Sequence, residues 1–390
     1  MSRLLVIVIF LSFVILSCKN ETFEFHPMPE RFPYESIDVP IVEINREYSS
    51  DIKEEIIKPD ESILGKKTFK KYFDFDSTFI IEKPEIDLNS IKYSSLNSTR
   101  GIILNPLSNT FLEYDSKNKL WSSIAKSGRG PGELMFPTDF HIKNQKIYVS
   151  TKDSRINIFD CQNPSCEFEK SISLNKIQPS SLTTYNENFL VLGLFSSLSQ
   201  GENSSSNSIN PLHFINKSGE IMNSFGEFYK TKNNWMLIQP FEKGSVKNIK
   251  IDNQHFYLHY YDKIPELYFL KNKELFKRYI FKDFVNSKHK YNTQNHELFV
   301  NVEDWSFLDN ITVLNNGKII VSIRHLSNRS LNEYGIIWDE NKDFYLIDLL
   351  KDKYSFLGSI DLNDENIWFS KHNIMHLKND TLSIHNYILK

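Results

Sequence analysis

The chain has 390 residues, with 46 lysine and arginine residues against 49 aspartate and glutamate residues, so no large positive field exists to attract nucleic acid. Apolar residues make up 40% of the sequence and charged residues 24%, which excludes wholesale disorder and allows a large core. The single alanine, Ala125, and an aromatic content of 14% disfavour a helix bundle, so an all-β fold is favoured.

The N-terminus predicts an export signal. Arg3 precedes a run from Leu4 to Leu16 that is apolar except for Ser12, and Ser17 and Cys18 follow directly. As a helix this run spans about 20 Å, less than the roughly 30 Å of bilayer hydrocarbon, so a cleaved signal is favoured over a permanent membrane helix. Residues 15–18 resemble the bacterial lipobox, which implies that residues 1–17 are a signal peptide and that Cys18 is lipidated. An ordinary cleaved signal is the alternative.

Residues 18–67 predict a tether that follows the lipidated cysteine. Five prolines lie among scattered charges without a sustained period, which indicates short extended pieces rather than a domain. Lys19, Asn20 and Glu21 resemble the signal that directs some Bacteroidetes lipoproteins to the outer cell surface, although a charged, solvated tether explains the same residues. We expect a cell-envelope lipoprotein of the outer membrane, facing the periplasm or the cell surface, that meets the bilayer only through its N-terminal lipid.

Residues 68–390 repeat one pattern, a pair of strands around a polar turn. Most of the turns carry Asn, Asp or Gly, which tolerate positive φ and suit hairpins. The turns are Asn144–Lys146, Asn186–Asn188, Asp252–Gln254, Asn315–Gly317 and Asn379–Asp380. The second strands of the pairs are predicted at Gly101–Leu104, Ile147–Val149, Phe189–Val191, Phe256–Leu258, Ile319–Val321 and Thr381–Ile384.

Third and fourth strands follow these pairs in the same repeating order. Four antiparallel strands in each of six units predict a six-bladed β-propeller. The third strands are predicted at Phe111–Tyr114, Arg155–Phe159, Pro211–Ile215, Pro265–Leu270 and Asp343–Leu349. The last unit has only two predicted strands in all. Its partners are expected from Phe69–Asp76 and Thr78–Glu82, so that N- and C-terminal strands close one blade, split two plus two or three plus one.

One stretch of the sequence carries a more specific pattern than the repeated strand pairs. It contains Gly128–Glu133, then Phe136 and Pro137, then Ile147–Val149 and Arg155–Asp160. This order resembles an NHL-type propeller repeat, and in particular the six-bladed propeller lipoproteins of Bacteroidetes. The glycines also raise the question of phosphate binding, but no Lys-Ser/Thr pair or helical pattern follows them, so a passage between two blades is the favoured interpretation.

The cysteines of the propeller region are Cys161 and Cys166, which enclose a short predicted turn. An oxidising envelope permits a disulfide there, which would contribute about 2 kcal/mol in the chain-entropy model. Free thiols are the alternative. A metal site is disfavoured because neither Cys nor His flanks the pair closely, and we expect neither a metal nor a cofactor.

No sequence motif predicts catalysis, since HExxH, GxSxG and P-loop patterns are absent from the sequence. Propeller enzymes can instead gather catalytic residues around the central channel from separate blades. The predicted inner strands offer Asp139, His141, Asp309, Asn310 and His376, a mixed set without a clear acidic cluster. A metal-dependent, lactonase-like centre is therefore an open alternative.

Ligand contacts are expected on the loops that join second to third strands. The long loop Arg324–Lys342 carries Arg324, His325 and Trp338, a cationic and aromatic mixture that suits a glycan or a peptide, while a solvated insertion is the other interpretation. Arg129, Asp139, His141 and Arg155 complete the candidate set. We expect a monomeric binding or scaffold module for a glycan, peptide or protein partner. The alternative is a hydrolase or lyase that acts on a saccharide or lactone at the channel.

Overall fold

The computed structural model describes residues 23–26, 33–34, 37–44, 46, 62–65, 67–88, 91–163, 165–174, 177–195, 208–229, 244–261, 264–284, 289–292, 297–300, 304–314, 317–332 and 335–390. The predicted signal peptide and Cys18 lie outside these residues. Among the described helices, none combines the length and the apolar character needed to cross a membrane.

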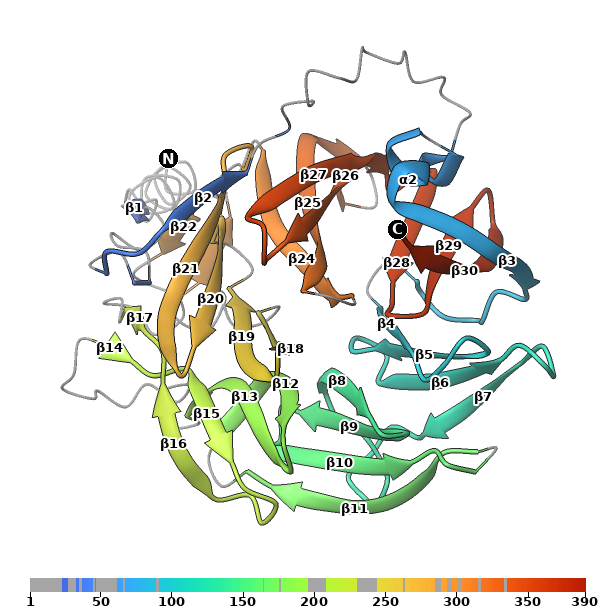
Figure 1. Ribbon diagram of the computed structural model, residues 1–390, viewed down its shortest axis with the longest axis horizontal. Helices are drawn as coiled ribbons and strands as arrows, with labels where there is room; N and C mark the ends of the chain where they lie inside the picture. Colours follow the sequence, from blue (N-terminus) through green and yellow to red (C-terminus); the bar gives the residue numbers. More distant parts are fainter. Residues whose placement is uncertain are drawn as a thin grey trace, which may run out of the picture.

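Six antiparallel sheets form a ring around a central channel (Figure 1), which confirms the six-bladed β-propeller with four-stranded blades. Blade 1 contains β4 (Lys92–Ser95), β5 (Arg100–Asn105), β6 (Thr110–Asp115) and β7 (Leu120–Ala125). Blade 2 contains β8 (Pro137–Lys143), β9 (Lys146–Thr151), β10 (Arg155–Asp160) and β11 (Glu167–Ser173). Blade 3 contains β12 (Ile177–Tyr185), β13 (Asn188–Phe195), β15 (Leu212–Ile215) and β16 (Ile221–Phe225).

The second half of the ring repeats this order. Blade 4 contains β18 (Ser245–Ile251), β19 (Gln254–Tyr260), β20 (Glu266–Lys271) and β21 (Glu274–Phe281). Blade 5 contains β24 (Trp305–Val313), β25 (Lys318–Asn332), β26 (Gly335–Asp348) and β27 (Lys353–Asp361). Blade 6 contains β28 (Glu365–Phe369), β29 (Asn373–Lys378), β30 (Thr381–Leu389) and β3 (Phe73–Ile81). Two smaller sheets, β1 (Phe23–His26) with β22 (His289–Asn292) and β23 (Glu297–Val300), and β14 (Ser208–Ile209) with β17 (Phe228–Tyr229), lie outside the blades.

The polar turns at Asn144–Lys146, Asn186–Asn188 and Asp252–Gln254 form the predicted hairpins between first and second strands, whereas Asn379–Asp380 joins a second strand to a third. Asn315 and Asn316 of the remaining predicted turn lie outside the described residues. Asn144 and Gln145 between β8 and β9 have φ values of 50° and 59°, and Asp252 and Asn253 between β18 and β19 have values of 47° and 62°. Such left-handed residues match the twist of the flanking strands in a two-residue hairpin. Each of these turns joins the first strand of its blade to the second.

Blade 6 is closed by three C-terminal strands and one N-terminal strand. β3 pairs antiparallel with β30, from Phe73 opposite Leu389 to Ile81 opposite Leu382. Two sequence predictions are corrected here. Residues 381–384 belong to the third strand of the blade, because β29 is the second, and a short helix, α2 (Lys67–Tyr72), precedes a single continuous strand where two N-terminal strands were expected.

Parts of the predicted tether pack on the propeller. β2 (Ile41–Ile44) adds a fifth, parallel strand to β21 of blade 4, and Ile44 is fully buried. Tyr34 is also buried, and the turn η1 (Ile63–Gly65) joins the apolar cluster between blades 5 and 6. These described residues therefore belong to the folded body, which revises the expectation that the whole of 18–67 is only a tether.

Apolar side chains fill the spaces between neighbouring blades. In β5, Ile102 and Leu104 pack toward blade 2 while Ile103 packs toward blade 6. Both faces of the strand are thus buried, since alternate residues of a strand point to opposite sides. Each of the six junctions between adjacent blades holds one such cluster among the described residues, which explains the continuous apolar runs of the central strands.

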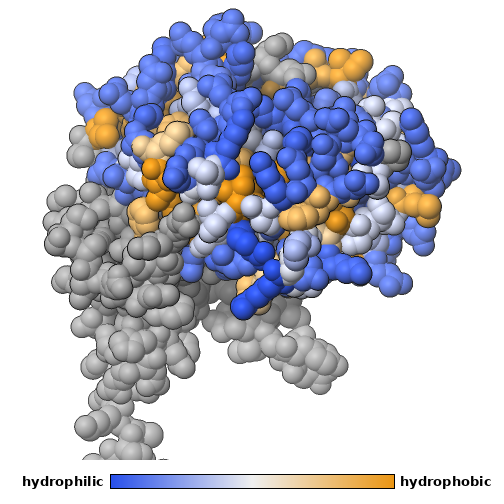
Figure 2. All heavy atoms as spheres, turned by 90° about the horizontal axis from the view of Figure 1, so that it is seen from below, coloured by the Kyte–Doolittle hydropathy of each residue, from blue (hydrophilic) through white to orange (hydrophobic). Residues whose placement is uncertain are grey.

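The outer surface is mainly polar on the side that Figure 2 shows, where hydrophobic residues form small groups separated by hydrophilic ones. Exposed large apolar residues are scattered along the chain, among them Ile80, Leu107 and Ile388. Singly scattered apolar residues are normal on a folded protein and do not by themselves mark a docking face.

Candidate functional site

The main cavity of the described residues lies in the central channel and has a volume of about 590 Å³. Its walls come from the first strands β4, β8, β18 and β24, with Thr183 of β12 and the turn between β28 and β29. The turn residues Asn144, Gln145 and Lys371 place its mouth at the end where the first strands finish. β25 starts beside the cavity and runs away from it, so the last residues of β25 and the first residues of β26 lie toward the opposite end. The described part of Arg324–Lys342, which the sequence predicts as a long loop, belongs to these two paired strands.

Asp139 is the buried charge at the inner end of this cavity. Its carboxylate lies 3.2 Å from Nζ of Lys92 on β4 and 3.7 Å from Nζ of Lys247 on β18, and it accepts a hydrogen bond from Oγ of Ser181 on β12. Burial raises the pKa of Asp139, but Lys247, Lys92 and Ser181 outweigh this effect, so the pKa lies below its ordinary value. Asp139 is therefore ionised at neutral pH and connects four blades.

Bulges in the first strands create this arrangement. The pairing register shifts between Pro137 and Asp139 in β8 and between Pro179 and Ser181 in β12. A bulge adds one residue and turns the next side chain in a new direction. Hydroxyls fix both bulges, since Oγ1 of Thr138 contacts Oγ of Ser150 at 2.8 Å and Oγ of Ser180 donates to the carbonyl of Leu192 at 3.1 Å.

Lys247 is half of the cationic pair at Asp139, and its ammonium is also largely buried. Burial lowers the pKa of Lys247, Asp139 opposes this effect, and the neighbouring charge of Lys92 adds to it. Two ammonium groups thus approach one carboxylate that is itself almost fully buried. The inner end of the cavity carries an excess of positive charge.

His141 lines the same cavity but takes a neutral role. Its Nε2 lies 3.0 Å from Oγ1 of Thr184, and burial lowers the pKa of His141 to about 3, with Lys247 adding to the shift. The imidazole is therefore uncharged at neutral pH, and the described contacts do not join it to Asp139. It supplies a polar ring surface rather than a charge.

Asp309 belongs to a second polar centre, in blade 5. Its carboxylate lies 2.9 Å from Nζ of Lys342 and 3.6 Å from a guanidinium nitrogen of Arg324, and it accepts a hydrogen bond from Ser322 at 3.3 Å. It lines a small space of about 40 Å³, and its neighbour Asn310 lines both this space and the main cavity. His376 lies elsewhere, with Nε2 2.7 Å from Glu365. The predicted channel set is therefore divided among separate networks.

His325 resembles part of a hydrolase triad, and its surroundings decide against that role. Nδ1 of His325 lies 2.7 Å from Oγ of Ser306, and Nε2 lies 3.2 Å from the carboxylate of Asp343. Ser306 and Asp343 are both fully buried, and Asp343 also lies 2.6 Å from Arg46. A nucleophile must reach its substrate, so this chain of contacts stabilises blade 5 instead. The side chain of Trp338 lies outside the described residues.

Arg129 and Arg155 shape the passage between blades 1 and 2. A guanidinium nitrogen of Arg155 lies 2.6 Å from Asp153, and another donates to the carbonyl of Arg129 at 3.3 Å. The backbone N–H of Gly130 donates to the carboxylate of Glu133 at 2.7 Å, and a Cβ on Gly128 would meet that carboxylate at 2.1 Å. The loop therefore holds its own carboxylate where a phosphate would bind, which supports the interpretation as a blade connection.

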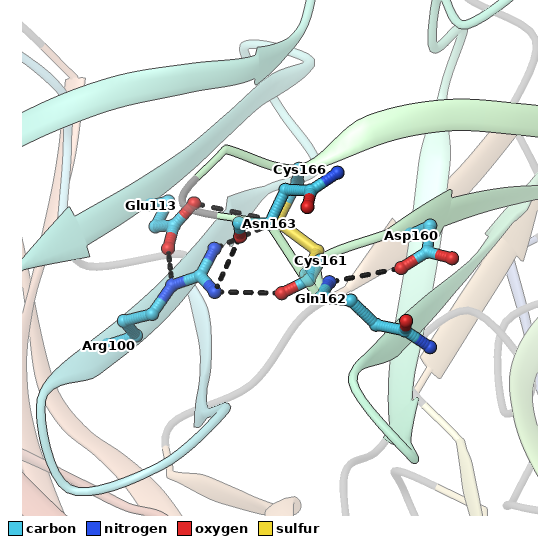
Figure 3. Close-up of a disulfide and its surroundings, with 7 residues drawn as sticks. All are labelled: Arg100, Glu113, Asp160, Cys161, Gln162, Asn163 and Cys166. Carbon is cyan, nitrogen blue, oxygen red and sulfur yellow. Dashed lines mark hydrogen bonds and ion pairs between the residues drawn. A yellow bond between two sulfur atoms is a disulfide. The ribbon is translucent and has the colours of Figure 1, made fainter.

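Cys161 and Cys166 form a disulfide with an S–S distance of 2.06 Å (Figure 3). Arg100 of blade 1 donates to the carbonyl of Cys161 at 2.8 Å and forms a buried ion pair with Glu113. The disulfide loop of blade 2 thus rests on a charged pair of blade 1. It lies on the outer hairpin of its blade rather than at the channel.

Sequence reasoning missed the lysines of the cavity. Lys92, Lys143, Lys247, Lys250 and Lys371 line it, against the single carboxylate of Asp139. They come from four blades and share no motif. The available signal was their place on or just after the predicted first strands, which converge on the axis of a propeller. Among the described residues, no group of three or more His, Cys, Asp or Glu side chains could hold a metal ion.

No family model and no curated protein matches the sequence. Solved structures do match the fold. A protein of Bacteroides fragilis NCTC 9343 whose export has been inferred is similar over 90% of this chain and 99% of its own, with 12% identity and a TM-score of 0.53. A member of the DUF4221 family from Bacteroides vulgatus ATCC 8482 is similar over 82% of this chain and 98% of its own, with 9% identity and a TM-score of 0.50. At such identities the likeness shows the shared propeller fold alone.

Proposed function

We propose that this chain is an envelope-anchored lipoprotein whose propeller binds a ligand in the channel cavity. The ligand is a glycan, a peptide or a segment of a protein. The observation that carries the proposal is the cavity itself, because a volume of about 590 Å³ with polar groups converging from several blades lies within the usual range of ligand sites. The NHL-like repeat between Gly128 and Asp160 and the lipobox at Cys18 support the same assignment.

Binding is favoured over hydrolysis because the carboxylates of the channel are held apart. Asp139 and Asp309 each contact their own two cations, and His141 contacts Thr184. A pair of carboxylates for acid and base catalysis needs a shared substrate position between them. A divalent metal at either aspartate would also have to displace the neighbouring ammonium groups.

A lyase is the second candidate, and Lys247 is the residue that favours it. Burial lowers the pKa of Lys247, which favours its proton-accepting form, and a lyase takes the proton beside the carboxylate of a uronate while the glycosidic oxygen on the neighbouring carbon leaves with its bonding electrons. Incubation with polygalacturonate tests this candidate. A rise in ultraviolet absorbance from the new carbon–carbon double bond, absent in Lys247→Met, would replace binding with catalysis.

An array of glycans and peptides tests the binding proposal on the full chain purified in detergent. Asn310→Trp places a bulky ring in the cavity and should abolish the interaction with every ligand that the wild type captures. Lys117→Trp, on the exposed turn between β6 and β7, is the matched control and should bind normally. Capture that survives Asn310→Trp would place the ligand elsewhere.

The anchor is tested separately. Cys18→Ala should prevent labelling with a radioactive fatty acid and either release the protein from the membrane fraction or leave it unprocessed. If the variant is processed, labelled and membrane-bound like the wild type, the lipoprotein assignment is wrong.

A further inference from the structure

The charges around Asp139 do not balance. Nζ of Lys92 and Nζ of Lys247 approach the two oxygens of one carboxylate, at 3.2 and 3.7 Å, and the Asp139 side chain is only 4% exposed. Two ammonium groups beside one carboxylate repel each other, and a second negative group would relieve this repulsion. One positive charge remains at the inner end of the cavity after Asp139 has been counted, so a negative group placed there would be stabilised.

The mouth of the cavity has the same sign. Among the described residues, no carboxylate lies within ion-pair distance of Lys250 or Lys371. Lys143 donates to the carbonyl of Asn186, a contact that leaves its charge in place. Cavity walls of low dielectric constant focus the field of such charges and raise the local concentration of an oppositely charged ligand.

Neutral hydrogen-bonding groups complete the lining. Asn144 and Gln145 lie at the mouth and Asn310 lies on the wall, whereas the aromatic residues Phe140 and Phe369 are almost fully buried. Amide side chains both donate and accept hydrogen bonds. The lining therefore suits a small hydrophilic molecule better than a flat apolar one.

On the basis of the proposed binding function, we propose that the cavity binds a small organic anion, whose carboxylate or phosphate group is held by Lys92 and Lys247 beside Asp139. Hydrogen bonds between an ammonium group and a charged oxygen are shorter and stronger than neutral ones. Lys250 and Lys371 draw the anion toward the mouth, and the amides contact its neutral groups. The positive excess excludes a simple cation as the occupant.

Isothermal titration calorimetry on the full chain in detergent tests this proposal with three probes: galacturonate, inorganic phosphate and neutral galactose. Galacturonate, phosphate or both should bind, and galactose should not. Lys247→Met and Lys92→Met should each weaken the anion at least about tenfold, because each removes one charge-assisted contact. Lys117→Met, an exposed lysine outside the cavity, should leave the affinity unchanged.

Two further variants keep the test informative if a buried substitution disturbs folding. Lys371→Met changes an exposed residue at the mouth and should weaken binding and reduce its dependence on salt. Asp139→Asn removes the competing carboxylate and should strengthen anion binding, whereas a purely structural role for Asp139 would only weaken it. Circular dichroism establishes which variants fold.

The outcomes separate this inference from the proposed function. Binding of galacturonate alone identifies a carboxylate ligand, and binding of phosphate alone identifies a phosphate ligand. If galactose binds as tightly as galacturonate and Asn310→Trp abolishes both, the cavity is a binding site but the anion inference is wrong. If neither anion binds at millimolar concentration while the glycan and peptide array yields a cavity ligand without charge, the inference is also wrong.

Discussion

Asp139 and Asp309 lie on the first strands of opposite blades, and each contacts two cations, yet the surroundings of the two aspartates differ. The cations of Asp309 are Arg324 and Lys342 of its own blade, and Arg324 is also 3.3 Å from Glu340. The cations of Asp139 are Lys92 and Lys247, which come from blades 1 and 4. Asp309 is therefore balanced within its own blade, whereas Asp139 joins separate blades and has two cations for one carboxylate beside the main cavity.

The comparison shows that similar pairs of charges acquire a role from what surrounds them. Beside Asp309 there is a space of about 40 Å³, too small for most ligands, and beside Asp139 there is a cavity of about 590 Å³. We expect Asp309 to contribute to the stability of blade 5 and Asp139 to combine stability with ligand binding. Three predictions test this distinction.

The largest effect is expected from breaking the ring on which both centres depend. Deleting residues 69–82 removes β3, exposes the edge of β30, and takes the buried residues Phe69, Phe73 and Ile81 from two blade junctions. We expect the deletion variant to aggregate or to lose cooperative thermal unfolding, which scanning calorimetry measures. Ile80→Ala, on the exposed side of the same strand, is the control and should unfold nearly like the wild type. A deletion variant with an unchanged melting temperature would show that β3 does not close the propeller.

Substitution of the two aspartates separates the centres directly. Asp139→Asn removes the carboxylate that Lys92 and Lys247 share, and Asp309→Asn removes the carboxylate that lies 2.9 Å from the buried ammonium of Lys342, so each should cost about 3–5 kcal/mol of the free energy of unfolding. Galacturonate or phosphate should restore much of the melting temperature of Asp139→Asn, because the bound anion supplies the negative charge that the substitution removes. It should not restore Asp309→Asn, whose surroundings have no room for it. Equal rescue of both variants would show that the space beside Asp309 admits the anion as readily as the cavity beside Asp139.

A smaller effect is expected on the pH dependence of stability, because His141 lies near Asp139 and is buried in its neutral form. The pKa of His141 is lowered to about 3 in the folded chain from about 6.5 in the unfolded chain. Between these values the unfolded chain binds more protons, so stability falls as the pH decreases from about 6.5 toward 3. His141→Asn should flatten part of this decline in urea unfolding measured at pH 7 and pH 5. An identical decline in the variant would show that His141 is not the group involved.

Much of the fold could be predicted because its signals are local. The turns at Asn144 and Asp252 and the alternating directions of Ile102, Ile103 and Leu104, which face two different blades, depend on neighbouring residues alone. The assignment of residues 381–384 failed because the strands of one blade look alike locally. Only the order of the sheet, β28-β29-β30-β3, shows that these residues begin the third strand. The packing of β2 on blade 4 was missed because four extended residues give no signal of a partner more than 200 positions away.

The candidate site was predicted only in part for a similar reason. Asp139 and His141 were recognised because they lie on a predicted inner strand and carry titratable groups. Arg324–Lys342 was also favoured as a ligand-binding loop, but its described residues belong to the paired strands β25 and β26 and lie toward the other end of the channel from the cavity mouth. Lys92 and Lys247 were missed because lysine is a common surface residue, and nothing in its local sequence distinguishes one that points along a shared axis.

The sequence by itself therefore determined the number of blades, the hairpin turns and the apolar faces, because strand alternation and turn chemistry act over a few residues. Tertiary structure alone decided the meeting of Lys92, Asp139, Ser181 and Lys247, which come from four different blades. The physical reason is that closing the ring brings the first strands to one axis, and bulges then turn single side chains by an amount that no periodic pattern encodes.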